Sequence, residues 1–298
     1  MHINLQETPT SQYQQWLQYA IAPRPICFAS TIDADGNVNL SPFSFFNLFS
    51  YLPPIIIFSP VRKMRDATTK HTLQNILEVP EVVINICDYD MLQQMSLSSC
   101  EFERGTDEFV KAGFTKQVAM LVKPPIVKEA KIKLECKVLE VKSLGDNGGA
   151  GQLVIAEIIC MHINDSILNE QGDMIDPKKL NLVARLGGDW YCKVDAINLF
   201  EVDKPTNKIA IGIDALPISI RNSKILTGNN LGQLANIYER PIVDANFIDD
   251  KLKTIIQYYA TDPKEMEQEL HIYAKELLDQ NNVQAGWQVL LVGENVFP

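Results

Sequence analysis

The stretch Ala22–Asn47, APRPICFASTIDADGNVNLSPFSFFN, decides the fold of the N-terminal part of this 298-residue chain. It holds two runs rich in apolar and β-branched residues, and the turn sequence DADGN joins them. Two such runs on either side of an Asp-Gly turn predict a β-hairpin. The last seven residues, Ser41–Asn47, mix large aromatic rings with small polar groups, which neither a plain core strand nor a surface loop explains.

The segments that follow predict further strands. The run Pro54–Pro60, PIIIFSP, is apolar throughout, so we expect a strand buried on both faces. The run EVVINICDYD predicts another strand. Between them, Leu73, Ile76 and Leu77 lie at helical spacing and predict a short helix within KHTLQNILEVP.

Two long runs in the middle of the chain predict a second hairpin. AKIKLECKVLEVKSL alternates apolar and charged residues, and GQLVIAEIICMHI follows it across the loop GDNGGAG. A glycine cluster can cradle a phosphate, but a nucleotide-binding loop lies between a strand and a helix. Here a strand follows, so we interpret the cluster as a plain hairpin loop. Six or more short strands with frequent turns are typical of a barrel or a sandwich.

The last third of the chain has helical patterns instead. One lies in DDKLKTIIQYYA, and another begins at Asp262 and Pro263 with Glu265 three residues past the cap, which is typical of a helix start. We expect the apolar stripe of the second helix to pack on the barrel or on a partner chain; it contains Met266, Leu270, Tyr273 and Leu277. The sequence therefore predicts two domains, residues 1–202 and an α-rich extension, residues 203–298.

Composition and charge exclude several classes of protein. A formal net charge of −10 argues against a general nucleic-acid binder, which needs a basic face. The apolar runs are too short to span a membrane, and no secretory signal is visible. The six cysteines form no C-x-x-C pair and the four histidines no H-x-x-x-H pair, so we expect no metal site. Cysteines within apolar runs indicate reduced structural thiols, which suits the cytoplasm.

A basic, hydroxyl-rich segment lies at Ser59–Asn75, SPVRKMRDATTKHTLQN. Free backbone N–H groups at a helix start, the helix dipole and nearby cations together favour a bound anion. A solvated basic loop explains the charges equally well, but the hydroxyls around the helix start favour a phosphate. The basic groups are Arg62, Lys63, Arg65, Lys70 and His71, and the hydroxyls belong to Thr68, Thr69 and Thr72.

The ring-rich segment Ser41–Asn47 can supply the rest of a cofactor pocket, because such sites are mostly apolar with a few polar groups. Alternation along a strand would put Phe43, Phe45 and Asn47 on one side and Ser44 and Phe46 on the other, so these side chains cannot all reach one ligand. For any single phenylalanine, core packing is the simpler interpretation. The polar candidates for the edge of a planar ring are Ser30, Thr31, Ser44 and Asn47.

Four motifs in order resemble those of the flavin reductase-like, FMN-binding split-barrel family. The stretch from Ala22 to Pro60 is similar to its Pro-Arg-Pro start, Asp-Gly hairpin and Asn-x-x-Pro-x-Ser-x-Phe segment. KHTLQNI resembles its Lys-Asp-Thr-Leu-x-Asn-Ile, with His71 in place of the usual aspartate and a few residues inserted before it. The strand that ends at His162, and LVARLGGDWYCKV with its Arg-x-Gly-Gly-x-x-Tyr pattern, complete a resemblance over roughly residues 20–200.

This resemblance implies a mainly β fold, a six-stranded split β-barrel with Greek-key topology and short helices, in a homodimer with FMN near the subunit interface. The family's flavin-edge and ring positions correspond to Ser30, Thr31, Ser44, Phe45 and Asn47. Its positions near the ribityl phosphate correspond to Ser59, Lys70 and Thr72, beside which this chain has Arg62, Arg65 and His71. His162 corresponds to a histidine near the flavin and is the candidate catalytic residue, as a nicotinamide contact.

We therefore expect an FMN-dependent oxidoreductase that receives hydride from NADH or NADPH and reduces a flavin or another small-molecule acceptor. The flavin ring carries the redox chemistry, so no catalytic triad is needed. An alternative is an FMN-binding electron-transfer protein without NAD(P)H-oxidising activity of its own. A third is an interaction protein on a degraded barrel. Nucleic acid and membrane are not expected partners.

Overall fold

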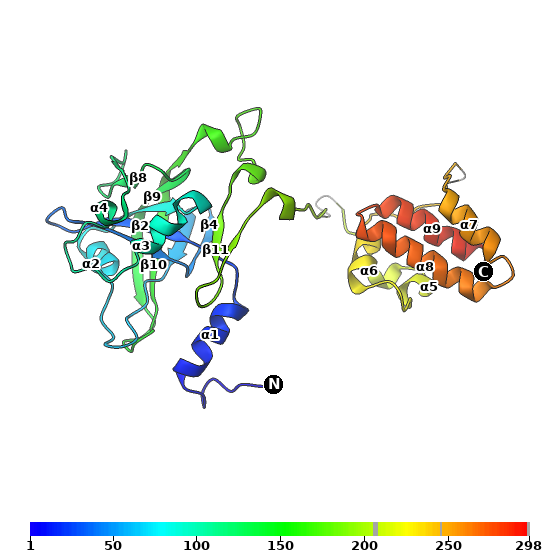
Figure 1. Ribbon diagram of the computed structural model, residues 1–298, viewed down its shortest axis with the longest axis horizontal. Helices are drawn as coiled ribbons and strands as arrows, with labels where there is room; N and C mark the ends of the chain where they lie inside the picture. The colour runs from blue at the N-terminus through cyan, green and yellow to red at the C-terminus, as the bar shows by residue number, and fades with distance from the viewer. Residues whose placement is uncertain (205–207, 245, 297–298) are drawn as a thin grey trace. The chain divides into compact units, whose positions relative to one another are not determined.

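The computed structural model describes residues 1–204, 208–244 and 246–296. The chain forms two compact units, Met1–Leu199 and Phe200–Pro298; the first contains the strands of the described residues, and the second contains the helices α5 to α9 (Figure 1). This division falls close to the predicted boundary after residue 202. Residues 205–207, close to this boundary, lie outside the described residues.

The N-terminal unit is built on one antiparallel sheet of seven strands in the order β3-β2-β6-β9-β10-β5-β4. The predicted hairpins are confirmed, since β2 pairs with β3 and β9 pairs with β10. The strands are β2 (Cys27–Ile32), β3 (Val38–Phe43), β4 (Phe46–Tyr51), β5 (Pro54–Phe58), β6 (Glu81–Ile86), β9 (Ile132–Ser143) and β10 (Gln152–Ile163).

The chain connection between β3 and β4 curls this sheet. These strands lie at opposite edges of the sheet, yet only Ser44 and Phe45 separate them in the chain. Two residues span less than about 10 Å, so the two edges must come together. The resemblance implies six strands, whereas the described sheet has seven, with β3 and β4 following each other directly.

Two expectations about strands were wrong. The predicted strand through Asn47 breaks after Phe43, because the chain leaves the edge beside β2 and crosses to β5, where Phe45 O accepts a hydrogen bond from Ser59 N at 2.8 Å. Phe43 and Phe45 therefore belong to no common strand face. The strand β5 is buried on one face only: Ile56 and Phe58 are buried, whereas Ile55 and Ile57, which point to the other face, are half-buried.

Smaller elements complete the N-terminal unit. A three-stranded sheet has the order β1-β11-β12, from β1 (Arg24–Pro25), β11 (Val183–Arg185) and β12 (Tyr191–Lys193). A two-stranded sheet contains β7 (Lys116–Gln117) and β8 (Ile126–Val127). The helices are α1 (Thr10–Ala20), α2 (His71–Glu78), α3 (Leu92–Leu97) and α4 (Glu108–Ala112). Short 3-10 turns lie at Tyr89–Met91, Asp165–Ile167, Pro177–Lys179 and Ala196–Asn198.

The helices α1 and α2 relate differently to the sheet. The predicted helix α2 packs Leu73 and Ile76 into the apolar cluster that contains Cys27 and Ala29 of β2, but Leu77, expected on the same apolar face, is 67% exposed. By contrast, α1 has no buried residue and projects from the sheet (Figure 1).

The C-terminal unit is helical, with α5 (Ile218–Arg221), α6 (Gly228–Ala235), α7 (Asp250–Tyr258), α8 (Pro263–Asp279) and α9 (Val283–Val296), and a 3-10 turn at Ile213–Ala215. As predicted, Asp262 caps α8, and its side chain accepts a hydrogen bond from Glu265 N at 3.1 Å. The stripe of α8 packs in the core of its own unit, against α9, so its expected packing on the barrel or a partner chain was wrong. Within the described residues, no helix combines the length and apolar character that crossing a membrane requires.

Candidate cofactor site

The turn between β3 and β4 borders a cavity of about 290 Å³, which we call the β3–β4 pocket. A second cavity of about 180 Å³ shares Phe43, Ser44 and Arg185 with it, so the two form one depressed region. The β3–β4 pocket is lined by Gln18, Arg24, Ser41, Pro42, Phe43, Ser44, Phe45, Ser59, Val61, Lys70, Ser99 and Arg185. Of the predicted cofactor-binding residues, the structure thus brings four together here: Ser44, Phe45, Ser59 and Lys70.

The break after β3 explains how the ring-rich segment reaches the pocket. Phe43 lies at the end of β3 and packs on Phe58, with 5.5 Å between the ring centroids. Phe45, in the turn, is 46% exposed, and Arg24 lies 5.8 Å from its ring centroid. Ser44 between them accepts a long hydrogen bond from Arg24 Nε, at 3.5 Å. The turn thus offers aromatic surface and a hydroxyl to the same cavity.

Arg24 also ties this wall to the chain on either side of it. Its guanidinium donates to the carbonyl oxygens of Gln18, Ile21 and Leu186, which join the end of α1 to the segment after β11. Burial, and then the positive charge of Arg185, lowers the pKa of Arg24. Two guanidinium groups held this close to one cavity favour an anionic or electron-rich ligand edge.

The start of α2 supplies a third cation. Lys70 is the residue before α2, no side chain caps the helix there, and its ammonium group is 3.9 Å from Glu101. Lys63 and His71 line a cavity of about 40 Å³ together with Lys70. Burial, followed by the positive charges of Lys63, Arg104 and Lys70, lowers the pKa of His71. Glu101 and Glu108 line this small cavity as well, so two ammonium groups and two carboxylates lie at the helix start, and of these four only Lys70 also lines the β3–β4 pocket.

Two of the predicted phosphate contacts lie outside the pocket lining. Arg62 donates to Asp146 at 3.2 Å and to the carbonyl oxygen of Ala67 at 3.0 Å. The side chain of Arg65 is 71% exposed and pairs with Asp66 and Glu101. These arginines stabilise the loop before α2, and the structure does not bring them to the pocket.

Three predicted hydroxyl contacts are buried in the protein instead. Thr31 accepts a hydrogen bond from Asn75 Nδ2 at 3.3 Å, and Thr72 donates to Asn39 Oδ1 at 2.6 Å, so both fix α2 against the sheet. The hydroxyl of Ser30 is buried without a hydrogen-bond partner among the described residues. Asn47 lies on the edge strand β4, where its Oδ1 accepts from Leu48 N at 2.8 Å.

The glycine-rich loop between β9 and β10 is a hairpin loop, as predicted. It forms hydrogen bonds with the chain that begins at the pocket residue Ser59. Gly149 N donates to Arg62 O and Arg62 N donates to Ala150 O, each at 3.0 Å. Ser59 Oγ accepts from Gln152 N at 3.0 Å while the residue also lines the pocket. The loop therefore fixes the chain from Ser59 onward.

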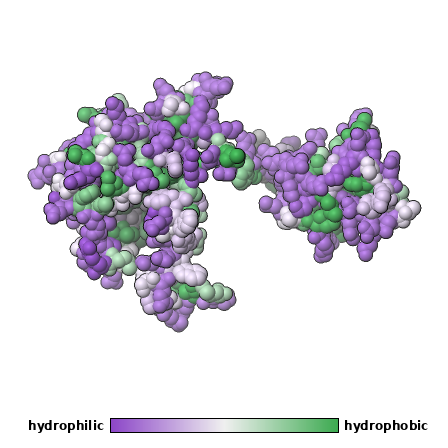
Figure 2. All heavy atoms as spheres, viewed as in Figure 1, coloured by the Kyte–Doolittle hydropathy of each residue, from purple (hydrophilic) through white to green (hydrophobic). Residues whose placement is uncertain are grey.

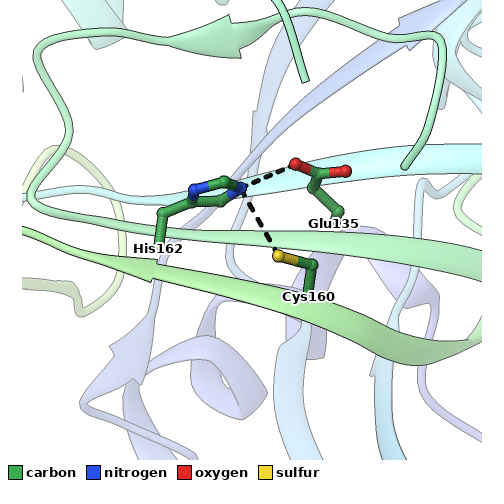
Figure 3. A group of neighbouring side chains, drawn as sticks. All are labelled: Glu135, Cys160 and His162. Carbon is green, nitrogen blue, oxygen red and sulfur yellow. Dashed lines mark hydrogen bonds and ion pairs between the residues drawn. The ribbon is translucent and has the colours of Figure 1, made fainter. Parts of the chain in front are cut away.

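His162 lies elsewhere, on β10. Its Nε2 is 2.6 Å from Glu135 Oε1 and 3.7 Å from Cys160 Sγ (Figure 3). Burial raises the pKa of Glu135, but hydrogen bonds from Met120 N, His162 and Leu121 N outweigh it and leave that pKa below its ordinary value. The structure does not place His162 in the β3–β4 pocket, and its catalytic role stays a prediction.

Sequence reasoning missed Arg24, Arg185 and Ser99 as lining residues. A signal existed for both arginines, because they belong to the Pro-Arg-Pro and Arg-x-Gly-Gly motifs that carry the family resemblance. Ser99 lies two residues after the end of α3, and nothing in its local sequence distinguishes it from other surface serines.

Several known proteins are similar to this chain in sequence or in fold. An uncharacterised protein of Halalkalibacterium halodurans is 33% identical over 208 residues, which cover 69% of this chain and 97% of that protein. Nitrilotriacetate monooxygenase component B from Bacillus cereus superposes with a TM-score of 0.63 at 27% identity, covering 68% of this chain and 98% of that one. A Shewanella frigidimarina structure with a split barrel domain gives a TM-score of 0.58 at 25% identity, covering 68% and 99%.

The family comparison covers the chain from the end of α1 to beyond β10, which includes all the residues that line the β3–β4 pocket except Gln18 and Arg185. A sequence model described as the flavin reductase like domain matches residues 19–177, more than half of the chain. This chain belongs to the flavin reductase-like family.

Proposed function

We propose that the chain is an FMN-dependent oxidoreductase that takes hydride from NADH or NADPH and reduces a small-molecule acceptor. The observation that carries this proposal is the convergence of Arg24, Lys70 and Arg185 on one aromatic-walled cavity, in a flavin reductase-like protein whose net charge is −10. Acidic residues outnumber basic ones in this chain, 37 to 27, so three cations around one cavity favour an anionic ligand. FMN is the flavin that the sequence resemblance implies.

The residues present fit this cofactor. Phe43 and Phe45 offer aromatic surface for a planar ring system, and Ser44 beside Arg24 offers polar atoms for its edge. Lys70, at the uncapped start of α2, would hold the phosphate. Bound FMN would supply the redox chemistry, while the chain binds it, orients it and limits its access to water.

The split barrel and the homodimer that the family resemblance implies are also part of this proposal. We take β3 and β4 as halves of one bent strand of a six-stranded Greek-key barrel within residues 1–202. The exposed apolar side chains in and just after α1, and those in and just after β4, would pack against a second copy of the chain, because large exposed apolar patches are typical of interfaces. They are Trp16, Leu17, Tyr19, Ile21, Phe49, Tyr51 and Leu52. Pale and green side chains mark α1 at the bottom of the view in Figure 2.

Absorbance spectroscopy tests the function. We expect the purified chain to bind added FMN at one per chain, and the bound flavin to lose its visible absorbance when NADH or NADPH is added without oxygen. A flavin that binds but stays oxidised would support the electron-transfer alternative. A chain that binds no FMN would overturn the proposal.

Lys70→Ala tests where the phosphate lies. Loss of one charge-assisted contact should weaken FMN binding by about 1.5–3 kcal/mol, roughly 10- to 150-fold in Kd. Lys142→Ala removes an exposed lysine of β9 outside the pocket lining and is the matched control. Fluorescence titration should separate the two variants, and equal FMN affinities would show that the phosphate lies elsewhere.

A further inference from the structure

Glu135, Cys160 and His162 gather three different metal-ligating atoms on one face of the main sheet (Figure 3). One carboxylate oxygen, the thiol sulfur and one ring nitrogen all lie within 4.8 Å of one another. None of the three residues lines the β3–β4 pocket, so the proposed flavin site does not account for the cluster.

A β-bulge brings these residues to the same face. Cys136 pairs with Ile158, but Glu135 pairs with Cys160, so Ile159 is an extra residue on β10. Without it, Glu135 would face Ile159, and Cys160 and His162 would lie on the opposite face of the sheet. Strands are rigid supports, so the ligand atoms are positioned before any ion binds.

Backbone hydrogen bonds already fix the orientation of the Glu135 carboxylate, as the hydrogen bonds around a metal site fix its ligands. Glu135 is fully buried, and its two oxygens accept hydrogen bonds from Met120 N at 2.8 Å and Leu121 N at 2.6 Å. In the part of the chain that the structure describes, its only ion-pair partner is His162. A buried carboxylate needs positive charge nearby, and such backbone contacts hold metal ligands in place.

The geometry disfavours the other use of a Cys–His–Glu set, a nucleophile with its base. In such a triad the acid contacts one ring nitrogen and the nucleophile the other. Here Nε2 faces both Glu135 and Cys160, so the acid and the thiol compete for one nitrogen. A cation placed between the three donor atoms would instead contact the carboxylate, the sulfur and the ring nitrogen at the same time.

We propose that Glu135, Cys160 and His162 bind one divalent transition-metal ion, with Zn²⁺ as the best chemical match to a thiolate, imidazole and carboxylate ligand set. Three protein ligands leave a fourth position, and the partial exposure of Cys160 and His162 opens it to solvent. On binding, the thiol proton leaves to solvent and the remaining imidazole proton moves to Nδ1. This departs from the expectation of no metal site, which relied on spacing within one segment.

Metal binding is measured on the full chain without flavin. After treatment with a chelator, the protein is dialysed against Zn²⁺ and its metal content measured, and Co²⁺ is then added as a spectroscopic probe. We expect one Zn²⁺ per chain and a near-ultraviolet thiolate-to-cobalt charge-transfer band. Cys160→Ser should abolish the band, and both Cys160→Ser and His162→Gln should weaken Zn²⁺ binding about tenfold or more.

Cys192→Ser is the matched control, because it removes another half-buried thiol that lies outside the cluster. It should keep both the cobalt band and the zinc content. The proposal is overturned if the chain binds no stoichiometric Zn²⁺, or if binding is the same in Cys160→Ser as in the unchanged protein. Because no flavin is present, this result is independent of whether FMN binds.

Discussion

His71 is half-buried at the first position of α2, close to three positively charged side chains. Burial and these charges lower its pKa, so the folded protein binds a proton at His71 less readily than the unfolded chain does, in which a histidine has a pKa of about 6.5. The stability from neutral His71 is therefore present above that pH and is lost as the pH falls through the folded-state pKa.

His71→Gln removes this titration. Relative to the unchanged protein, the variant should gain stability as the pH falls from about 7.5 to about 5. Urea unfolding at several pH values measures the difference, in which the titrations shared by both proteins cancel. His2→Gln, which replaces an exposed histidine near the chain start, is the matched control. If the difference in unfolding free energy between His71→Gln and the unchanged protein does not change with pH, the pKa of His71 is not lowered.

Glu108 is a buried carboxylate that fixes the strand leading into the pocket. It accepts hydrogen bonds from Asn39 Nδ2 at 2.8 Å and from Leu40 N at 3.0 Å, and Asn39 in turn accepts from Thr72. Glu108→Ala would leave two buried donors without partners and should lower the free energy of unfolding by about 1–3 kcal/mol. Glu103→Ala, which truncates an exposed glutamate nearby, should change it little. Equal unfolding midpoints would show that water replaces the carboxylate.

For single residues, the sequence predicted which types of side chain line the pocket better than it predicted which groups each side chain contacts. Ser44, Phe45, Ser59 and Lys70 line the pocket, but Ser30, Thr31 and Thr72 are buried. A short hydroxyl side chain can bond a ligand or a buried amide equally well. Which one it meets depends on contacts such as that of Thr31 with Asn75, 44 positions away, which local periodicity does not encode.

Among the elements, the loop between β9 and β10 closely approaches the backbone of the segment before α2. A Cβ atom on Gly148 would lie 2.6 Å from Met64 O and 3.0 Å from Lys63 O. Backbone atoms cannot move aside as the end of a side chain can, so Gly148→Ala should displace the loop or the chain after Ser59. We expect a loss of about 1–3 kcal/mol in stability, by analogy with overpacked cores, and weaker FMN binding.

Gly228→Ala provides the comparison for this substitution. Gly228 begins α6, and nothing lies within 4 Å of a Cβ atom built there. Thermal unfolding and FMN titration of both variants distinguish a steric effect at Gly148 from a general effect of losing a glycine. If Gly148→Ala keeps the stability and affinity of the unchanged protein, the close contact does not support the pocket.

Local periodicity was enough to predict the hairpins, α2, α7 and α8, because each carries its own turn, cap or apolar face. It failed where the decisive contact is remote. The strand break at Ser44 follows from the partner change between β2 and β5, and the β10 bulge follows from pairing with β9. The helix α1 was not predicted from the sequence, because it has no buried residue and therefore no apolar stripe to indicate it.

For the whole molecule, each unit has its own apolar core. The core of the C-terminal unit draws its buried residues from between Leu216 and Leu291, whereas the two clusters of the N-terminal unit lie between Ile26 and Val183. The flavin reductase like match ends at residue 177, inside the N-terminal unit. All residues that line the β3–β4 pocket belong to that unit as well.

We therefore expect residues 1–202 to fold alone and to bind FMN nearly as the full chain does, with binding free energies within about 0.5 kcal/mol, because distant sites act almost additively. Calorimetry of the full chain should show two transitions, and only the one that the fragment reproduces should shift to higher temperature when FMN is added. A single transition, together with a fragment that has lost its FMN affinity, would instead mean that the helical unit completes the flavin site.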